Sequence, residues 1–270
     1  MKRLVNLDAP PAMRRMLGLL PFVLLIVLYV LASDARLAIN PADKLLPSFS
    51  SMSDALLRMA FEPSKRSGEY LFWTDTWSSI RRLGIGVGLA ALIGLSLGIA
   101  TGAIPLANAL FSPLLTAVSL IPCLALLPIL FIVLGLGELS KITLITLGIT
   151  PFIARDIQRR AREIPAEQLI KAQTLGANTA QIICRVLLPQ LLPKLINSVR
   201  LSLGTGWLFL IAAEAIASTE GLGYRIFLVR RYLSMEVIIP YVLWITLLAF
   251  VFDLLLRRLG KRLFPWELPE

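Results

Sequence analysis

The sequence predicts an all-α, polytopic membrane protein with six transmembrane helices and a helical loop on the cytoplasmic side. Hydrophobic residues make up 57% of the 270 residues and charged residues only 16%, against about 25% charged residues in typical soluble domains. The apolar residues form long blocks, as membrane-spanning segments do, instead of one-sided stripes. Basic residues flank these blocks, for example at 14–15 and 257–258, as is typical of membrane surfaces.

Six apolar blocks are candidates for spanning helices, each of which needs about 20 mostly apolar residues. They cover residues 17–32, 83–104, 110–134, 139–154, 195–218 and 237–256. The first and fourth blocks are short, so the sequence does not define their ends.

These blocks divide the chain into regions on either side of a membrane. We expect a cytoplasmic N-terminal segment at 1–16, a first transmembrane helix at 17–32, an extracytoplasmic loop at 33–82, a transmembrane core at 83–256 that includes a cytoplasmic loop at 155–194, and a cytoplasmic tail at 257–270. Both termini are placed in the cytoplasm because Lys and Arg are more numerous on that side, and a long outer loop translocates despite its charges. The first block could instead be a cleaved signal peptide, which leaves the orientation of the later blocks unchanged.

Residue types that are absent or rare exclude several functions. The chain has no histidine, so histidine-based triads and zinc sites are excluded, and we expect no metal site. Cys123 and Cys184 are expected in a span and on the cytoplasmic side, where a disulfide is not expected. The net charge of +10 comes without a groove-reading motif, so we expect no nucleic-acid binding.

The second block carries a row of small residues with a spacing of four. The row consists of Gly86, Ala90, Gly94, Gly98 and Gly102. Residues at this spacing share one helix face, and small residues there let another helix approach closely. We expect this face to pack against a helix of the same subunit or of a second copy.

Four residues are candidates for the lining of a solute pathway. Ser119 and Pro122 lie in a proline-rich block, where prolines free backbone carbonyls and bend helices; a packing kink is the alternative. Trp207 is either interior packing or a pathway contact. Glu214 is a carboxylate deep in a span, which is unfavourable and often functional. The alternative for Glu214 is a structural role, paired with a basic residue such as Arg225 or hydrogen-bonded to a helix end.

The inter-span loops contain three further predicted features. Residues 53–61 of the outer loop have the pattern of one short amphipathic helix. The second outer loop, 219–236, is basic and is either a solvated rim or a docking surface for an acidic partner. Asp253 and Arg257 are four residues apart, as in an ion pair on a helix surface.

The cytoplasmic loop has the pattern of a helix–turn–helix. Pro165 suits the first turn of a helix, and Glu167 follows near the positive end of the helix dipole. Gly176 permits the left-handed turn that ends a helix. A second short helix at 179–187 is expected to stop at Pro189. By itself, such a hairpin could also lie on lipid headgroups.

The residues of this loop resemble the EAA loop of binding-protein-dependent ABC importers. That pattern is Glu-Ala-Ala, three residues, Gly, nine residues, Ile-x-Leu-Pro. Ala172, Gly176 and Leu188-Pro189 have the matching spacing. Ile170, however, occupies the position of the glutamate, and Glu167, one turn earlier, is the expected substitute. The resemblance implies contact with an ATPase through Glu167, Lys171, Ala172, Leu175, Gly176, Ala177, Leu188 and Pro189.

Later segments narrow the resemblance to permeases of the nitrate, taurine, alkanesulfonate and bicarbonate importer family. These segments include Arg200-Leu201-Ser202-Leu203-Gly204, Ala212-Ala213-Glu214 and Gly221-Leu222-Gly223-Tyr224. The segment 61–66 also resembles permeases found with urea- or guanidine-degradation genes. The resemblance implies a permease subunit in the bacterial inner membrane. Its solute would be a nitrate-, sulfonate- or bicarbonate-like anion or a small nitrogen compound, moved into the cytoplasm by alternating access.

The resemblance also implies the partners of the chain. These are a second copy of the permease in a homodimer, cytoplasmic ABC ATPase subunits that carry ATP and Mg, a periplasmic or lipid-anchored substrate-binding protein, and membrane lipid. The chain lacks the Gly-x-x-x-x-Gly-Lys-Ser/Thr loop that cradles phosphates, so we expect no cofactor and no catalytic site in it. The alternatives are a membrane enzyme, for which no cluster of nucleophile and base is visible, and an ATP-independent secondary transporter or channel, for which no internal repeat is visible.

Overall fold

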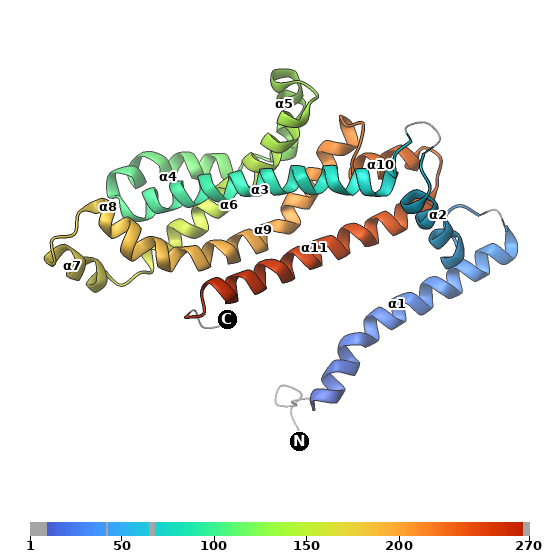
Figure 1. Ribbon diagram of the computed structural model, residues 1–270, viewed down its shortest axis with the longest axis horizontal. Helices are drawn as coiled ribbons and strands as arrows, with labels where there is room; N and C mark the ends of the chain where they lie inside the picture. The colour runs from blue at the N-terminus through green and yellow to red at the C-terminus, as the bar shows by residue number, and fades with distance from the viewer. Residues whose placement is uncertain (1–9, 42, 65–67, 267–270) are drawn as a thin grey trace.

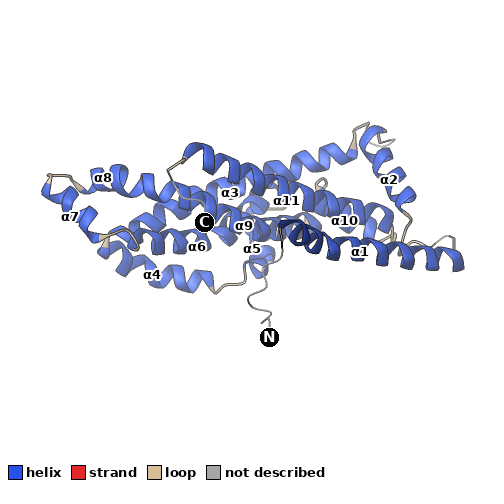
Figure 2. Ribbon diagram, turned by 90° about the horizontal axis from the view of Figure 1, so that it is seen from below, coloured by secondary structure: helices blue, strands red, loops and turns tan. Residues whose placement is uncertain are grey.

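The computed structural model describes residues 10–41, 43–64 and 68–266, and this part of the chain is helical without a strand (Figure 2). The centre of the bundle consists of α3 (Leu71–Ala103), α6 (Glu138–Arg162) and α9 (Leu188–Ile216). A fourth long helix, α11 (Met235–Leu263), packs along α9 (Figure 1). The predicted all-α fold is therefore confirmed.

The row of small residues on α3 lies against α6 of the same chain. A Cβ atom built on Gly98 would lie 2.6 Å from the Ile157 side chain, and one built on Gly94 would lie 2.7 Å from Ile153. Side chains cannot approach so closely, so this helix spacing requires small residues on α3. Facing the row, Ile145, Ile153 and Ile157 of α6 are completely buried. The two helices thus form the rigid centre of the molecule.

The number of spanning helices differs from the six that the sequence predicts. Four helices of the described chain are long and apolar enough to cross a membrane, or up to five if one bent pair counts as a single span. α6 does not qualify, because it carries charged residues near both ends, including Glu138, Lys141 and Arg155. The six-helix count is therefore not confirmed, although α6 lies within the bundle.

The third predicted span, 110–134, is not one helix. α4 (Pro105–Ser119) is followed by a 3-10 turn (Cys123–Leu126) and by α5 (Leu127–Leu134), and the two halves are bent by 85°. The break precedes Pro122, which lacks an N–H group and disfavours helical backbone in the residue before it. As a result, α5 projects away from the bundle (Figure 1).

The outer segments contain more helix than predicted. α2 (Phe49–Phe61) starts at the cap Ser48 and confirms the expected amphipathic helix. α10 (Leu222–Arg230) occupies half of the second predicted outer loop. α1 (Pro11–Ile39) lies apart from the bundle (Figure 1) and is attached near its end, where the Tyr29 hydroxyl donates to the Pro47 carbonyl at 2.7 Å.

The segment 155–194, predicted as a cytoplasmic loop, is also more helical than a loop. α6 continues to Arg162, and α7 (Ala166–Thr174) and α8 (Thr179–Ile182) follow. A π-helical turn, Ile183–Leu187, leads directly into α9. The predicted stop at Pro189 is therefore wrong: Pro189 occupies the first turn of α9, where its missing N–H is tolerated.

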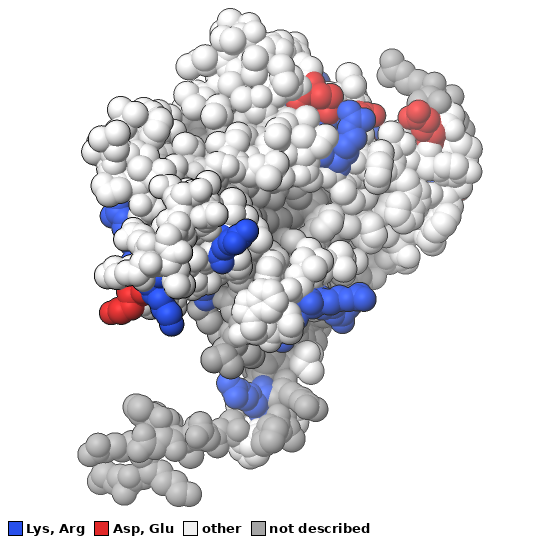
Figure 3. All heavy atoms as spheres, turned by 60° about the vertical axis from the view of Figure 1, so that its left-hand side comes forward, with Lys and Arg blue, Asp and Glu red and all other residues white. Residues whose placement is uncertain are grey.

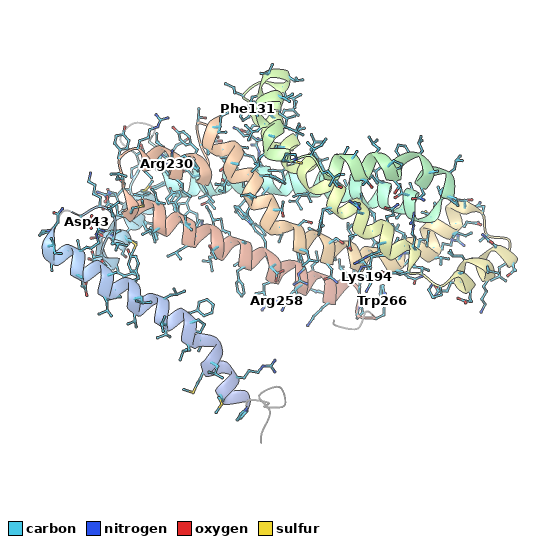
Figure 4. The ribbon with its side chains drawn as sticks, turned by 180° about the vertical axis from the view of Figure 1, so that it is seen from behind. Asp43, Phe131, Lys194, Arg230, Arg258 and Trp266 are labelled. Atoms are coloured by element: carbon cyan, nitrogen blue, oxygen red, sulfur yellow. The ribbon has the colours of Figure 1, made fainter. Side chains whose placement is uncertain are left out.

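The two ends of the bundle carry different elements. α7 and α8 lie at one end, and α2 and α10 lie at the other (Figure 1). Figure 4 places Lys194, Arg258 and Trp266 near the C-terminal end of α11, whereas Asp43 and Arg230 lie at the end that carries α2 and α10.

Candidate functional site

The knob, residues 163–187, is an exposed helical turn whose shape is determined by local hydrogen bonds. Gly176 has a φ of 82°, in the left-handed region, and the Ala177 N–H donates to the Ala172 carbonyl at 3.0 Å, which closes the end of α7. Asn178 and Gln181 then form a reciprocal capping box that starts α8. The left-handed turn expected at Gly176 is thus present.

The knob presents apolar side chains to its surroundings. Leu175 is 81% exposed and Ile170 is 57% exposed, and Glu167 and Lys171 are exposed beside them. Exposed apolar groups of this kind are typical of surfaces that contact another protein. Figure 3, in which the left-hand side of Figure 1 comes forward, shows separate patches of Lys and Arg on a largely uncharged surface.

A side-chain contact joins the knob to α9. The Gln190 amide of α9 donates to the side-chain oxygen of Gln168 on α7 at 3.0 Å. Leu188 and Pro189, two of the predicted contact residues, lie in the first turn of α9. The predicted contact residues therefore divide between the knob and the beginning of α9.

A cleft of about 1250 Å³ opens between the α4–α5 break, α6 and α9. Ser119 and Pro122, two of the four candidate pathway residues, line it. Trp207 and Glu214 do not. Trp207 is buried and its ring packs against Phe252, with centroids 6.4 Å apart. The structure therefore brings only half of the predicted pathway residues together.

Glu214 lies instead in a buried charged cluster at the end of the bundle that carries α2 and α10 (Figure 1). It is completely buried, and Arg82 is 1% exposed. The Arg82 guanidinium donates to Glu214 at 2.7 Å and to Glu138 at 2.6 Å. Glu214 also accepts from the Ser79 hydroxyl at 2.8 Å and from the Gly223 N–H at 2.9 Å. One carboxylate thus joins α3, α9 and the start of α10.

The contacts of Glu214 fit the structural alternative, a basic partner and a hydrogen bond to a helix end, but the basic partner is Arg82. Arg225, the example that the sequence suggested, pairs with Asp75 instead. The Arg225 guanidinium donates to the completely buried Asp75 at 2.7 Å, and the Gly221 N–H donates to the same carboxylate at 2.9 Å. Gly221 has a φ of 122°, and a Cβ built on it would lie 2.5 Å from the Glu214 carboxylate. The start of α10 is therefore anchored by two buried carboxylates from two helices.

Comparison with known proteins identifies the family. The family model described as "Binding-protein-dependent transport system inner membrane component" matches residues 90–265. The chain belongs to this family. It is 36% identical over 195 residues to the taurine transport system permease protein TauC of Escherichia coli (strain K12), covering 72% of this chain and 71% of that protein.

Other relatives have the same role. The putative aliphatic sulfonates transport permease protein SsuC of Bacillus subtilis (strain 168) is 31% identical, covering 70% of this chain and 68% of that protein. The bicarbonate transport system permease protein CmpB of Synechocystis is 28% identical, covering 93% and 88%. The MetNI methionine ABC transporter in an inward-facing conformation has a chain of the same fold, with a TM-score of 0.64, 24% identity and coverage of 74% of this chain and 98% of that chain.

The chain is thus an inner-membrane permease subunit of an ABC importer, as the sequence predicts. Two charged residues of this permease were missed, because the sequence assigned 33–82 to the outer loop. Asp75 and Arg82 lie inside α3 instead. A signal was available: Asp75, Ser79 and Arg82 have the spacing of one helix face.

A second charged contact of the permease lies near the C-terminal part of α11. Asp253 and Arg257 approach within 3.7 Å, as the spacing suggested. The closer partner of Asp253 is Arg200 of α9, whose guanidinium donates to it at 2.9 Å. This contact attaches α11 to α9 at a position along α9 between the knob and the charged cluster around Glu214.

Proposed function

We propose that this permease carries a small anion of the sulfonate, nitrate or bicarbonate class into the cytoplasm. The relatives named for taurine, aliphatic sulfonates and bicarbonate support this class. The observation that carries the proposal is the cleft on the knob side of the bundle, where arginines outnumber carboxylates. The lining includes Arg155, Arg159, Arg160 and Arg162 with Asp156 and Glu163. Such a lining attracts anions and disfavours guanidinium-like cations.

A small nitrogen compound is the alternative solute. It depended on the resemblance of segment 61–66, of which residues 65 and 66 lie outside the described part of the chain. The basic cleft favours the anion over a cationic solute of this kind.

The partners in this proposal are a second permease copy, two ATPase subunits with ATP and Mg, and an external substrate-binding protein. Each knob would contact one ATPase subunit through its exposed apolar residues, Ile170 and Leu175, with Glu167 as the acidic contact. The C-terminal end of α11 would lie in the cytoplasm, since Gly260 lies near Ile196 in the early part of α9, on the knob side. We attribute ATP hydrolysis to the ATPase and none to this chain.

Uptake by proteoliposomes tests the proposal. The permease would be reconstituted with its ATPase and supplied with its substrate-binding protein, and uptake of radiolabelled taurine, nitrate, bicarbonate and guanidinium would be compared. We expect ATP-dependent uptake of at least one of the three solutes that carry an anionic oxygen group, the sulfonate of taurine included, and none of guanidinium. Uptake driven by an ion gradient without ATP, or uptake of guanidinium alone, would contradict the proposal.

A further inference from the structure

The cleft has a charged part and an apolar part. Its charged residues lie on the last two turns of α6, from Arg155 to Glu163. Its apolar residues lie on all three walls and include Ile121, Leu124, Phe152 and Phe209. Arg155 lies where the two parts meet, about 10 Å from the end of α6 at the usual helical rise.

Most charges of the cleft are balanced by neighbours. Asp156 approaches Arg159 at 3.3 Å and Arg160 at 3.8 Å, and it also accepts a hydrogen bond from Ser198. Glu163 approaches Arg159 at 3.7 Å. Both carboxylates of the cleft are therefore next to arginines that lie beyond Arg155 on α6.

Two cleft arginines lack a carboxylate partner among the described residues. Arg162, at the end of α6, donates to the Asn108 side-chain oxygen, and Arg155 lies where the charged and apolar parts of the cleft meet. In the described part of the chain its guanidinium contacts no carboxylate, and it donates to the Ser119 hydroxyl at 2.8 Å. Ser119 in turn donates to the Thr116 carbonyl at 2.8 Å, so it holds one edge of the guanidinium against the end of α4. A guanidinium has five N–H donors, and most of those of Arg155 remain available to the cleft.

An arginine within a spanning bundle is unfavourable unless it faces protein or a watery cavity, and it commonly marks a solute path. A guanidinium also binds carboxylate-like oxyanions through two parallel hydrogen bonds. We propose that Arg155 is the specificity-determining residue of the cleft and binds the negative end of the solute, with Ser119 as its positioning residue. This inference rests on the proposed function and assigns its selectivity to one side chain.

Thiol-labelling rates test the charge of the site without transport. Thr205, an exposed residue of the same cleft on α9, would be replaced by cysteine in a Cys123→Ala, Cys184→Ala background. The assembled permease–ATPase complex, without ATP, would react with the anionic reagent 2-sulfonatoethyl methanethiosulfonate or with its cationic trimethylammonium counterpart. We expect Arg155→Gln to lower the anion-to-cation rate ratio about fivefold, the effect of one unit charge on reagents of opposite sign in a watery cleft.

Two variants serve as controls. Arg155→Lys keeps the charge and should keep the ratio. Arg159→Gln removes a charge that is 66% exposed and paired with two carboxylates, so the ratio should change by less than about twofold. A purely structural effect of Arg155→Gln would alter both labelling rates together and leave their ratio constant. An unchanged ratio in Arg155→Gln, or an equal fall in Arg159→Gln, would overturn the inference.

Transport gives the second measurement. Uptake of the anion that the wild type carries should fall roughly tenfold in Arg155→Gln, the loss expected for one charged hydrogen bond, while ATP hydrolysis continues. Normal uptake by Arg155→Gln would overturn the inference. If no anion is carried but the labelling ratio falls, the proposed solute class fails and the anion site at Arg155 remains.

Discussion

Replacement of Arg82 by methionine tests whether the buried charged cluster around Glu214 stabilises the fold. The substitution removes the donor that lies 2.7 Å from Glu214 and 2.6 Å from Glu138. Glu138 is 39% exposed, so water can replace the lost contact, whereas Glu214 is completely buried. The unpaired buried carboxylate should cost about 3–5 kcal/mol. At about 2–4 °C per kcal/mol for a large domain, the melting temperature should fall by roughly 6–20 °C.

The double variant Arg82→Met, Glu214→Gln tests directly whether an unpaired charge causes the destabilisation. Glu214→Gln alone removes one charge and should cost about 1–3 kcal/mol, because Arg82 keeps Glu138. In the Arg82→Met background, however, the same change removes the unpaired charge and should raise the melting temperature. Thermal unfolding of the purified proteins in detergent would measure this double-mutant cycle.

A matched control is available on α11. Arg257→Gln removes a pair in which both side chains are partly exposed, 55% for Arg257 and 35% for Asp253. It should cost about 1 kcal/mol or less. The reasoning is refuted if Arg82→Met is no more destabilising than Arg257→Gln, or if Glu214→Gln destabilises the Arg82→Met protein further.

Three further predictions concern the knob and the helix packing. Gly176→Val adds roughly 1–2 kcal/mol of backbone strain to the turn of the knob. Vesicle assays should then show continued ATP hydrolysis with uptake reduced about tenfold. Normal uptake would contradict a coupling role for this turn. Gly98→Ala places a Cβ 2.6 Å from the Ile157 side chain and should lower the melting temperature. Gly88→Ala, whose Cβ would meet open space, should leave the melting temperature unchanged. Equal effects of the two substitutions would contradict the packing of α3 on α6. Glu167→Ala should weaken ATPase binding roughly fivefold in a titration, and unchanged binding would exclude Glu167 as the acidic contact.

The sequence predicts well those features that depend on local residues. Four of the six apolar blocks coincide with helices that are long and apolar enough to cross a membrane, because burial in lipid requires a continuous apolar stretch. Gly176 predicts the turn of the knob because few other residues adopt its backbone conformation. The amphipathic pattern at 53–61 likewise predicts α2, which spans Phe49–Phe61.

Features that depend on distant residues were missed. α3 begins at Leu71, before its apolar block, because partners elsewhere in the chain neutralise Asp75 and Arg82. Glu214 is recognisable in the sequence as a carboxylate in an apolar block, but its partner Arg82 lies 132 residues away in the chain. No local pattern indicates which of several arginines pairs with Glu214, and Arg225, the example that the sequence suggested, pairs with Asp75 instead.

One continuous helical segment connects the knob with the charged cluster around Glu214, and this connection has a thermodynamic consequence. The helical segment Thr179–Ile216 contains 38 residues and ends just after Glu214, a length of roughly 57 Å. Both ends therefore belong to one continuous helical body. If ATPase binding at one end shifts that body, a protein bound at the other end must change the ATPase affinity by the same factor, because such coupling is reciprocal. If the proposed binding protein docks at the end that carries α10, its loading should be detectable, without any transport, as a change in ATPase affinity at the knob.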